Sequence, residues 1–210
     1  TKEELITWGE LPELPNTKGL SGAFSGLSNG ALIVAGGITF IENSGSDGGI
    51  ENWNDSLYVL PGDEEAGWIS DFALKKPLAY GASVSTGKSL ILIGGRNAEG
   101  YQSEVSEITW DPATKRVNEE NLPSLPHAIA YSGAAIKGST LYVVGGQGRD
   151  EETAPVNIFL SLDLKKLKAG WKELATWEGP ARRKAITVAQ SIGIITYIYI
   201  IGGEGLYKDA

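Results

Sequence analysis

The chain lacks cysteine and methionine entirely, and its 210 residues include one histidine and nine prolines. The absence of cysteine excludes disulfides, a thiolate nucleophile and any sulfur-ligated metal. A single histidine, His127, leaves too few imidazoles for a histidine-based metal centre, and we interpret it as a residue of a surface turn. We therefore expect no metal site.

Basic charge and long apolar runs are also scarce. Lysine and arginine number 18 against 26 acidic residues, which gives a net charge of −8. A basic patch that attracts nucleic acid or an anionic membrane surface is therefore not expected. No stretch approaches 18 uninterrupted apolar residues, so we expect no membrane span. Hydrophobic residues still make up 41% of the chain, enough for a sizeable core.

Glycine is abundant, with 28 residues, and it recurs in a pattern. Gly-Gly pairs stand at 36/37, 94/95, 145/146 and 202/203, at spacings of 58, 51 and 57 residues. Each pair follows an apolar run, as in "LILIGG". Before each run come a tight turn and a small-residue segment; these segments are Gly22–Leu27, Gly81–Ser85, Gly133–Ile136 and Ile186–Gln190. A period of this length indicates a repeat architecture.

Each repeat continues with an alternating segment, such as "DSLYVL", and a fourth segment that carries Trp68, Val117 or Trp171. Four short antiparallel strands joined by tight turns are typical of one blade of a β-propeller. Glycine fits a sharp bend between crowded blades because it adopts positive φ and has no Cβ. The sequence predicts an all-β chain whose second strands end at Gly37, Gly95, Gly146 and Gly203. A plain β-sandwich, the alternative, does not explain a glycine pair at the same place in four repeats.

A Gly-Gly after an apolar strand, followed by an apolar strand and a tryptophan, is the kelch pattern. We predict a single kelch-type propeller domain over 1–210. Its blades would be 19–76, 77–126 and 127–180, with an incomplete fourth at 181–210. Residues 1–18 would be the closing strand of the last blade. Because about three and a half blades cannot close a ring, we expect a six-bladed full protein.

Several segments narrow the resemblance. "SGAFSGLSNGALIVAGG" and "PLAYGASVS" are similar to the N-acetylneuraminate epimerases, the sialic acid mutarotases, and specifically to their cyclically permuted group. The resemblance implies an isomerase that interconverts the anomers of an acidic sugar without metal or redox cofactor. It also implies a periplasmic or secreted location, with a cytoplasmic one as the alternative. A kelch module that only binds a protein or glycan partner is the alternative function, because kelch folds serve both roles.

The resemblance also implies site residues. In this family the loop after the first glycine pair carries a proton-accepting Glu, then Gly-Gly or Gly-Leu, then two lysines. The matching positions here are Asp47 for the Glu and Ile50 and Glu51 for the lysines. Asp47 is thus the predicted catalytic base, one methylene shorter than the family's residue. The loss of two positive charges should weaken anion binding, which favours the binding-module alternative.

Further candidates follow the other glycine pairs, where we expect loops 96–102, 147–156 and 204–210 to gather with 38–54 at one mouth of the channel. Arg96 and Arg182 are the predicted anchors for the substrate carboxylate, with Arg183 as the register alternative to Arg182. Gln147 is the predicted partner of a sugar hydroxyl. Five residues are weaker candidates. Glu204 could serve as an acid, and Glu51 and Glu99 could serve as the base in place of Asp47. Trp53 and Tyr101 are aromatic residues able to stack on a sugar or between blades.

Overall fold

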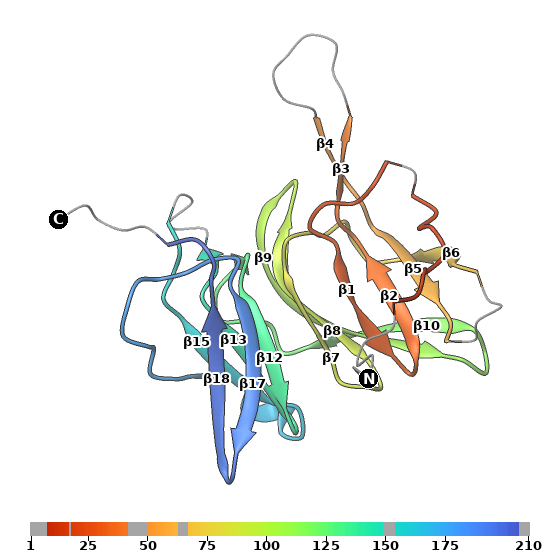
Figure 1. The fold of residues 1–210 in the computed structure, drawn as a ribbon. Helices are drawn as coiled ribbons and strands as arrows, with labels where there is room; N and C mark the ends of the chain where they lie inside the picture. The colour runs from red at the N-terminus through yellow and green to blue at the C-terminus, as the bar shows by residue number, and fades with distance from the viewer. Residues whose placement is uncertain (1–7, 17, 42–49, 63–66, 149–153, 206–210) are drawn as a thin grey trace, which may run out of the picture.

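The computed structural model describes residues 8–16, 18–41, 50–62, 67–148 and 154–205 (Figure 1). These residues form antiparallel strands and a single 3₁₀ turn, η1 (Leu167–Ala169), with no α-helix among them. The all-β prediction is confirmed. Within the described ranges, no helix has the length and apolar character needed to cross a membrane.

Three four-stranded sheets follow one another along the chain, and each is built from a separate segment of the sequence. The first contains β1 (Phe24–Ser28), β2 (Ala31–Ala35), β5 (Ser56–Leu60) and β6 (Ile69–Ala73). The second contains β7 (Ala82–Ser85), β8 (Leu90–Asn97), β9 (Gly100–Asp111) and β10 (Arg116–Leu122). The third contains β12 (Gly133–Lys137), β13 (Thr140–Val144), β15 (Phe159–Asp163) and β16 (Lys172–Glu173).

A fourth, two-stranded sheet contains β17 (Ile186–Ile192) and β18 (Ile195–Ile201). Two short strand pairs complete the described topology. β3 (Ile38–Ile41) and β4 (Ile50–Trp53) form a hairpin, and β11 (Ile129–Ala130) pairs with β14 (Gln147–Gly148) across the intervening β12 and β13.

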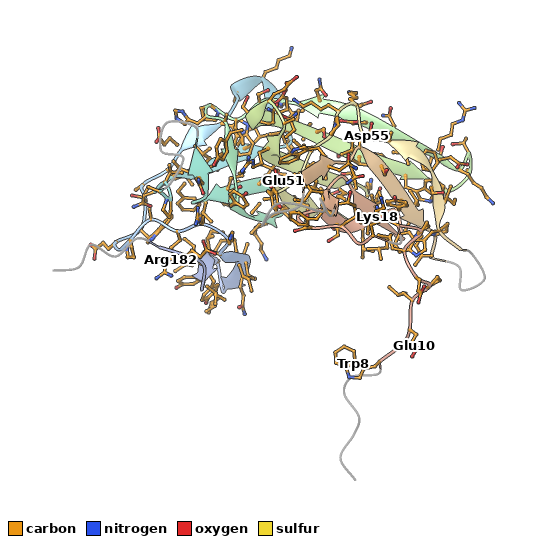
Figure 2. The ribbon with its side chains drawn as sticks, turned by 90° about the horizontal axis from the view of Figure 1, so that it is seen from above. Trp8, Glu10, Lys18, Glu51, Asp55 and Arg182 are labelled. Carbon is orange, nitrogen blue, oxygen red and sulfur yellow. The ribbon has the colours of Figure 1, made fainter. Side chains whose placement is uncertain are left out.

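The sheets lie side by side through their first strands. β1 contacts β7, β7 contacts β12, and β12 contacts β17, so the sheets fan out from a common inner edge (Figures 1 and 2). The core lies between neighbouring sheets: Phe24, Ile33 and Trp110 belong to the cluster shared by the first two, and Ile93 and Leu141 to the cluster shared by the second and third. This is the packing of propeller blades.

The glycine pairs stand where the backbone of the next sheet docks. The Gly145 φ is +58°, and a Cβ on this residue would lie 2.2 Å from the Arg182 carbonyl oxygen. The N–H of Gly146 donates to that same oxygen at 2.7 Å. In the first repeat Gly37 N donates to the Leu78 carbonyl at 2.9 Å, and this carbonyl excludes a Cβ from Gly36. A side chain at the first glycine would therefore displace the neighbouring sheet.

The second strands end close to the glycine pairs but not on them. β2 ends at Ala35 and β13 at Val144, whereas β8 continues through its glycines to Asn97, with a register shift between Ile93 and Gly95. The expectation of a loop over 96–102 is therefore wrong. This segment is mostly strand, and the turn itself is Ala98–Glu99. The β3–β4 hairpin likewise occupies both ends of the expected loop 38–54.

Two tryptophans make equivalent contacts outside the glycine region. Trp171 Nε1 donates to the Pro123 carbonyl at 2.8 Å, just after β10 of the preceding sheet. Trp68 Nε1 donates to the Pro12 carbonyl at 2.9 Å, in the N-terminal segment. Residues 8–16 form no strand, and Trp8, 92% exposed, lies on a segment that extends away from the sheets (Figure 2). The closing-strand assignment of 1–18 stays a prediction.

Substituting alanine for Gly145 and, separately, for Gly138 distinguishes two contributions to stability: the docking of neighbouring sheets and the strain of a left-handed backbone. Gly138 has nearly the same φ, +59°, but its Cβ would meet nothing within 4 Å. Gly138→Ala should cost about 1–2 kcal/mol for the left-handed backbone alone. Gly145→Ala should cost at least about 1 kcal/mol more, because it also disrupts a buried inter-sheet hydrogen bond. Urea unfolding of both variants measures the difference, and equal losses would contradict the docking role.

Candidate functional site

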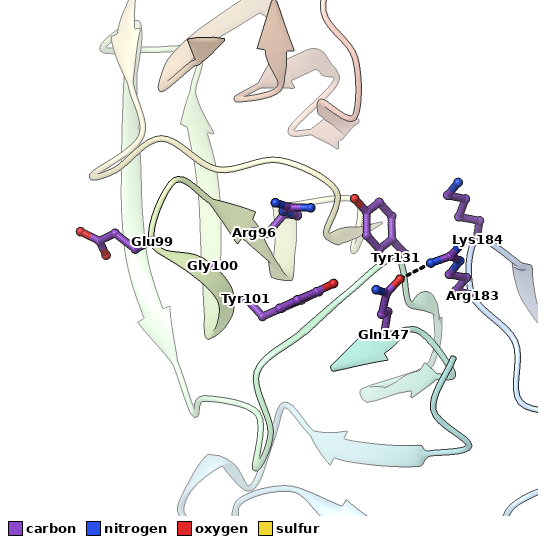
Figure 3. A pocket seen from close by; sticks show the side chains of 8 residues that line it. All are labelled: Arg96, Glu99, Gly100, Tyr101, Tyr131, Gln147, Arg183 and Lys184. Carbon is purple, nitrogen blue, oxygen red and sulfur yellow. Dashed lines mark hydrogen bonds between the residues drawn. The ribbon is translucent and has the colours of Figure 1, made fainter. Parts of the chain in front are cut away.

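A pocket of about 450 Å³ lies where the second, third and fourth sheets meet, on the side of the glycine pairs (Figure 3). Its lining residues come from three successive repeats and are mainly polar or charged; they are Arg96, Glu99, Gly100, Tyr101, Tyr131, Gln147, Arg183 and Lys184. Its volume falls within the usual range for a small-molecule site.

One backbone pairing, repeated in each sheet, brings these side chains together. The residue after each glycine pair is paired antiparallel with a residue just before the inner strand of the same sheet. The pairs are Ser21 with Ile38, Ala79 with Arg96, Ala130 with Gln147, and Arg183 with Glu204. Equivalent positions of neighbouring sheets thus face the same opening.

Arg96 is half-buried between aromatic rings. Its guanidinium carbon lies 5.5 Å from the centre of the Trp53 ring and 5.8 Å from that of Tyr101. Its Nε is buried without a hydrogen-bond partner, and among the described residues Arg96 forms no ion pair. Partial burial is the largest single influence and lowers the pKa of Arg96, but the hydrogen bond with Tyr131 and the electrostatic influence of Tyr131, Glu51 and Tyr101 together raise the pKa. Arg96 therefore stays charged while its donors are incompletely used.

The opposite wall carries a charged network. Arg183 Nη1 donates to Gln147 Oε1 (Figure 3), and Arg183 Nε donates to Glu204 Oε2 at 2.8 Å. Lys184 Nζ donates to the other oxygen of Glu204, also at 2.8 Å. These bonds, first from Lys184 and then from Arg183, lower the pKa of the Glu204 carboxyl. Gln147, 4% exposed, is held by this network at the base of the pocket.

The arrangement suits an anionic ligand. Three cationic side chains line the pocket, Arg96, Arg183 and Lys184, together with the Glu99 carboxylate. Glu204, just outside the lining, pairs with Arg183 and Lys184, so these side chains still hold one more positive than negative charge. This local excess of positive charge occurs in a chain whose net charge is −8. An arginine with unused donors binds a carboxylate through two parallel hydrogen bonds.

The structure brings two of the predicted site residues into this pocket, Arg96 and Gln147. Arg182 does not line it: its Nη1 donates to the Gly202 carbonyl at 2.8 Å, and the register alternative Arg183 lines the pocket instead. Asp47, the predicted base, lies outside the described residues.

Sequence reasoning missed Tyr131 and Lys184. Both lie two residues before the first residue of the inner strand of their repeat, at the position that Gly22 and Tyr80 occupy in the first two. In the first three repeats this position lies at the same distance before the glycine pair. An alignment of the repeats could therefore have identified it from the sequence.

Comparisons with known proteins support the resemblance. No protein-family model matches the chain. The N-acetylneuraminate epimerase of Salmonella enteritidis PT4 is 39% identical over 119 residues, which are 50% of this chain and 30% of the relative. That of Vibrio cholerae serotype O1 is 32% identical over 117 residues, with the same coverage. Half of this chain is similar to N-acetylneuraminate epimerases. The matched segment spans less than a third of these relatives' length.

A solved structure described as "Structure of YjhT" has the same fold. It superposes with a TM-score of 0.65 at 15% identity, over 87% of this chain and 59% of that one. The likeness in fold therefore extends beyond the half of the chain that matches in sequence.

The Glu204 network predicts a pH dependence. A carboxyl whose folded pKa is lowered contributes stability above its unfolded pKa of about 4.3, and loses it as pH falls through the folded value. Glu204→Gln should therefore be less stable than wild type near neutral pH, and the two should converge in acid. Glu173→Gln, on the exposed strand β16, is the control.

NMR titration should show that Lys184→Met raises the titration midpoint of the Glu204 carboxyl. An unmoved midpoint would contradict the network.

Proposed function

We propose that the protein containing this chain is a mutarotase that interconverts the anomers of N-acetylneuraminate. The observation that carries the proposal is Arg96, a charged, half-buried side chain with an unpartnered Nε, in a cationic pocket of monosaccharide size. Similarity to proteins named N-acetylneuraminate epimerase supports the same ligand class.

The pocket offers a partner for each part of such a ligand. Arg96 would hold the carboxylate, and Lys184 would add positive charge on the facing wall. Gln147 and Tyr131 would meet hydroxyl groups, since both carry donors and acceptors at the lining. The polar side chains thus orient the ligand, while Tyr101 supplies apolar ring surface.

The reaction requires only proton transfers. A base removes the proton of the anomeric hydroxyl as the bond from the anomeric carbon to the ring oxygen breaks. The electron pair of that bond stays on the ring oxygen, which takes a proton from an acid, and the carbon becomes a ketone. Reclosure on the other face reverses these transfers. No oxidation state changes, so the chemistry needs neither metal nor redox cofactor.

The resemblance assigns the base to Asp47. Its carboxylate is one methylene shorter than the family's Glu, so we propose that it acts at the limit of hydrogen-bond reach or through one water. A non-catalytic kelch module is the second candidate, favoured by Ile50 and Glu51 at the two lysine positions.

Exchange between the two anomers, followed by NMR with the full chain and with the uncatalysed rate subtracted, tests the activity. Asp47→Glu should hold or raise the catalysed rate, and Asp47→Asn should lower it by about 100- to 10,000-fold, the usual size of a general-base contribution. A wild-type rate for Asp47→Asn would move the base to Glu51, Glu99 or Glu204. No wild-type rate above background would favour the binding module.

Two arginine variants test the anchor. Arg96→Ala should weaken binding of N-acetylneuraminate by about 1.5–3 kcal/mol, because it removes charge-assisted hydrogen bonds to the carboxylate. Arg183→Ala should weaken binding less, because Arg183 bonds Glu204 and holds Gln147 in place. Arg116→Ala, an exposed arginine on β10, changes the net charge equally and should bind as wild type. Titration calorimetry gives all three affinities, and unchanged binding in both pocket variants would remove the proposed anchor.

A further inference from the structure

Four equivalent residues, one before each inner strand, share a left-handed backbone. Gly22, Tyr80, Tyr131 and Lys184 have φ values of 66°, 61°, 57° and 57°. Their backbones form a continuous chain of hydrogen bonds from sheet to sheet. Tyr80 N donates to Gly22 O at 2.8 Å, Tyr131 N to Tyr80 O at 2.7 Å, and Lys184 N to Tyr131 O at 2.7 Å. These contacts fix the left-handed position around the inner edge of the sheets.

Three of these four positions hold a residue for which this conformation is strained. A left-handed backbone costs a non-glycine residue about 1–2 kcal/mol, and such outliers concentrate at sites of function. Glycine would avoid the cost at Tyr80, Tyr131 and Lys184. A role for the side chains themselves would offset this backbone cost.

The strained side chains form one row. The Tyr80 ring lies 6.1 Å from Trp53, edge to face, and 5.1 Å from Tyr131. Lys184 Nζ lies 5.6 Å from the centre of the Tyr131 ring. At Gly22 a Cβ would lie 2.4 Å from Tyr80 Cδ1, so the Tyr80 ring fills the space that a side chain would need. Tyr131 is thus held between Tyr80 and Lys184.

Tyr131 is the tyrosine of this row that lines the pocket, and its hydroxyl points toward Arg96 (Figure 3). Arginine carries donors and no acceptor, so the phenol oxygen can only accept from Arg96. The proton of the Tyr131 hydroxyl is then directed away from Arg96. The same neighbour that would hold the ligand carboxylate therefore leaves this proton for an oxygen of that ligand.

We propose that Tyr131 is the proton donor to the ring oxygen of the bound sugar acid, with Tyr80 as the residue that positions it. On ring opening the phenol O–H bond breaks, its proton passes to the ring oxygen, and the electron pair of the cleaved C–O bond remains on that oxygen. The phenolate takes the proton back on reclosure. The assignment rests on the proposed mutarotase function.

Tyr131→Phe tests the assignment, because it removes the hydroxyl and keeps the ring in its row. The anomer exchange rate at saturating sugar should fall by about 100- to 10,000-fold. The affinity for N-acetylneuraminate should fall only about two- to tenfold, the worth of one neutral hydrogen bond. Tyr142→Phe, a tyrosine on β13 packed against Phe159, should behave as wild type.

The outcomes separate the two proposals. An active wild type with an equally active Tyr131→Phe overturns the Tyr131 assignment alone. A wild type that binds the sugar without catalysing exchange overturns the mutarotase function and the proton transfer together. In that case, weaker sugar binding by Tyr131→Phe would show that the Tyr131 hydroxyl still contacts the ligand. Unchanged binding would show that this hydroxyl does not contact the ligand.

The role of Tyr80 has its own test. Tyr80→Ala should lower the exchange rate by loosening Tyr131, and Tyr80→Phe, which keeps the ring, should restore it. Loss of activity in both variants, with the unfolding midpoint unchanged, would contradict a positioning role carried by the ring.

Discussion

The docking of the first three glycine pairs against a carbonyl of the next repeat is the contact on which the rest of the structure depends. Gly37 N to Leu78 O and Gly146 N to Arg182 O join neighbouring sheets backbone to backbone, with no side chain between them. Because the contact is short and directional, it sets how far each sheet turns from the last. The residue that follows the pair lies next to this contact, and in the second and third repeats this residue, Arg96 or Gln147, lines the pocket.

The repeats share one backbone arrangement and differ in the side chains that they place near the pocket. The position after the glycine pair is Ile38, Arg96, Gln147 or Glu204 in successive repeats, and the left-handed position ahead of the inner strand is Gly22, Tyr80, Tyr131 or Lys184. In the first repeat these two positions hold an apolar residue and a glycine, whereas in the later repeats they hold charged, amide or phenol side chains. The described pocket accordingly lies against the second, third and fourth sheets.

The strands were predictable because their signals are local: apolar runs, tight turns and a glycine pair. The site was only partly predictable, because it depends on pairing across sheets. Arg96 and Gln147 follow glycine pairs, the sequence named them as candidates on that ground, and both line the pocket, while their role stays a prediction. The choice between Arg182 and Arg183 depends on strand pairing, in which adjacent residues point to opposite sides, and Arg183 is the one paired with Glu204. Tyr131 was hidden because its role follows from a left-handed φ that tyrosine seldom adopts.

The charged groups on one wall of the pocket are paired with one another, whereas Arg96 on the other wall has no ion-pair partner among the described residues. Glu204 balances Arg183 and Lys184, and this wall keeps Gln147 in place. Arg96 has aromatic faces on both sides, which tolerate its charge without neutralising it. A half-buried guanidinium with an unpartnered Nε is costly on its own and gains most from a bound carboxylate. For the sugar acid proposed as the ligand, this asymmetry would set the orientation: its carboxylate would lie at Arg96, and its ring would extend past the Tyr131 hydroxyl toward Gln147.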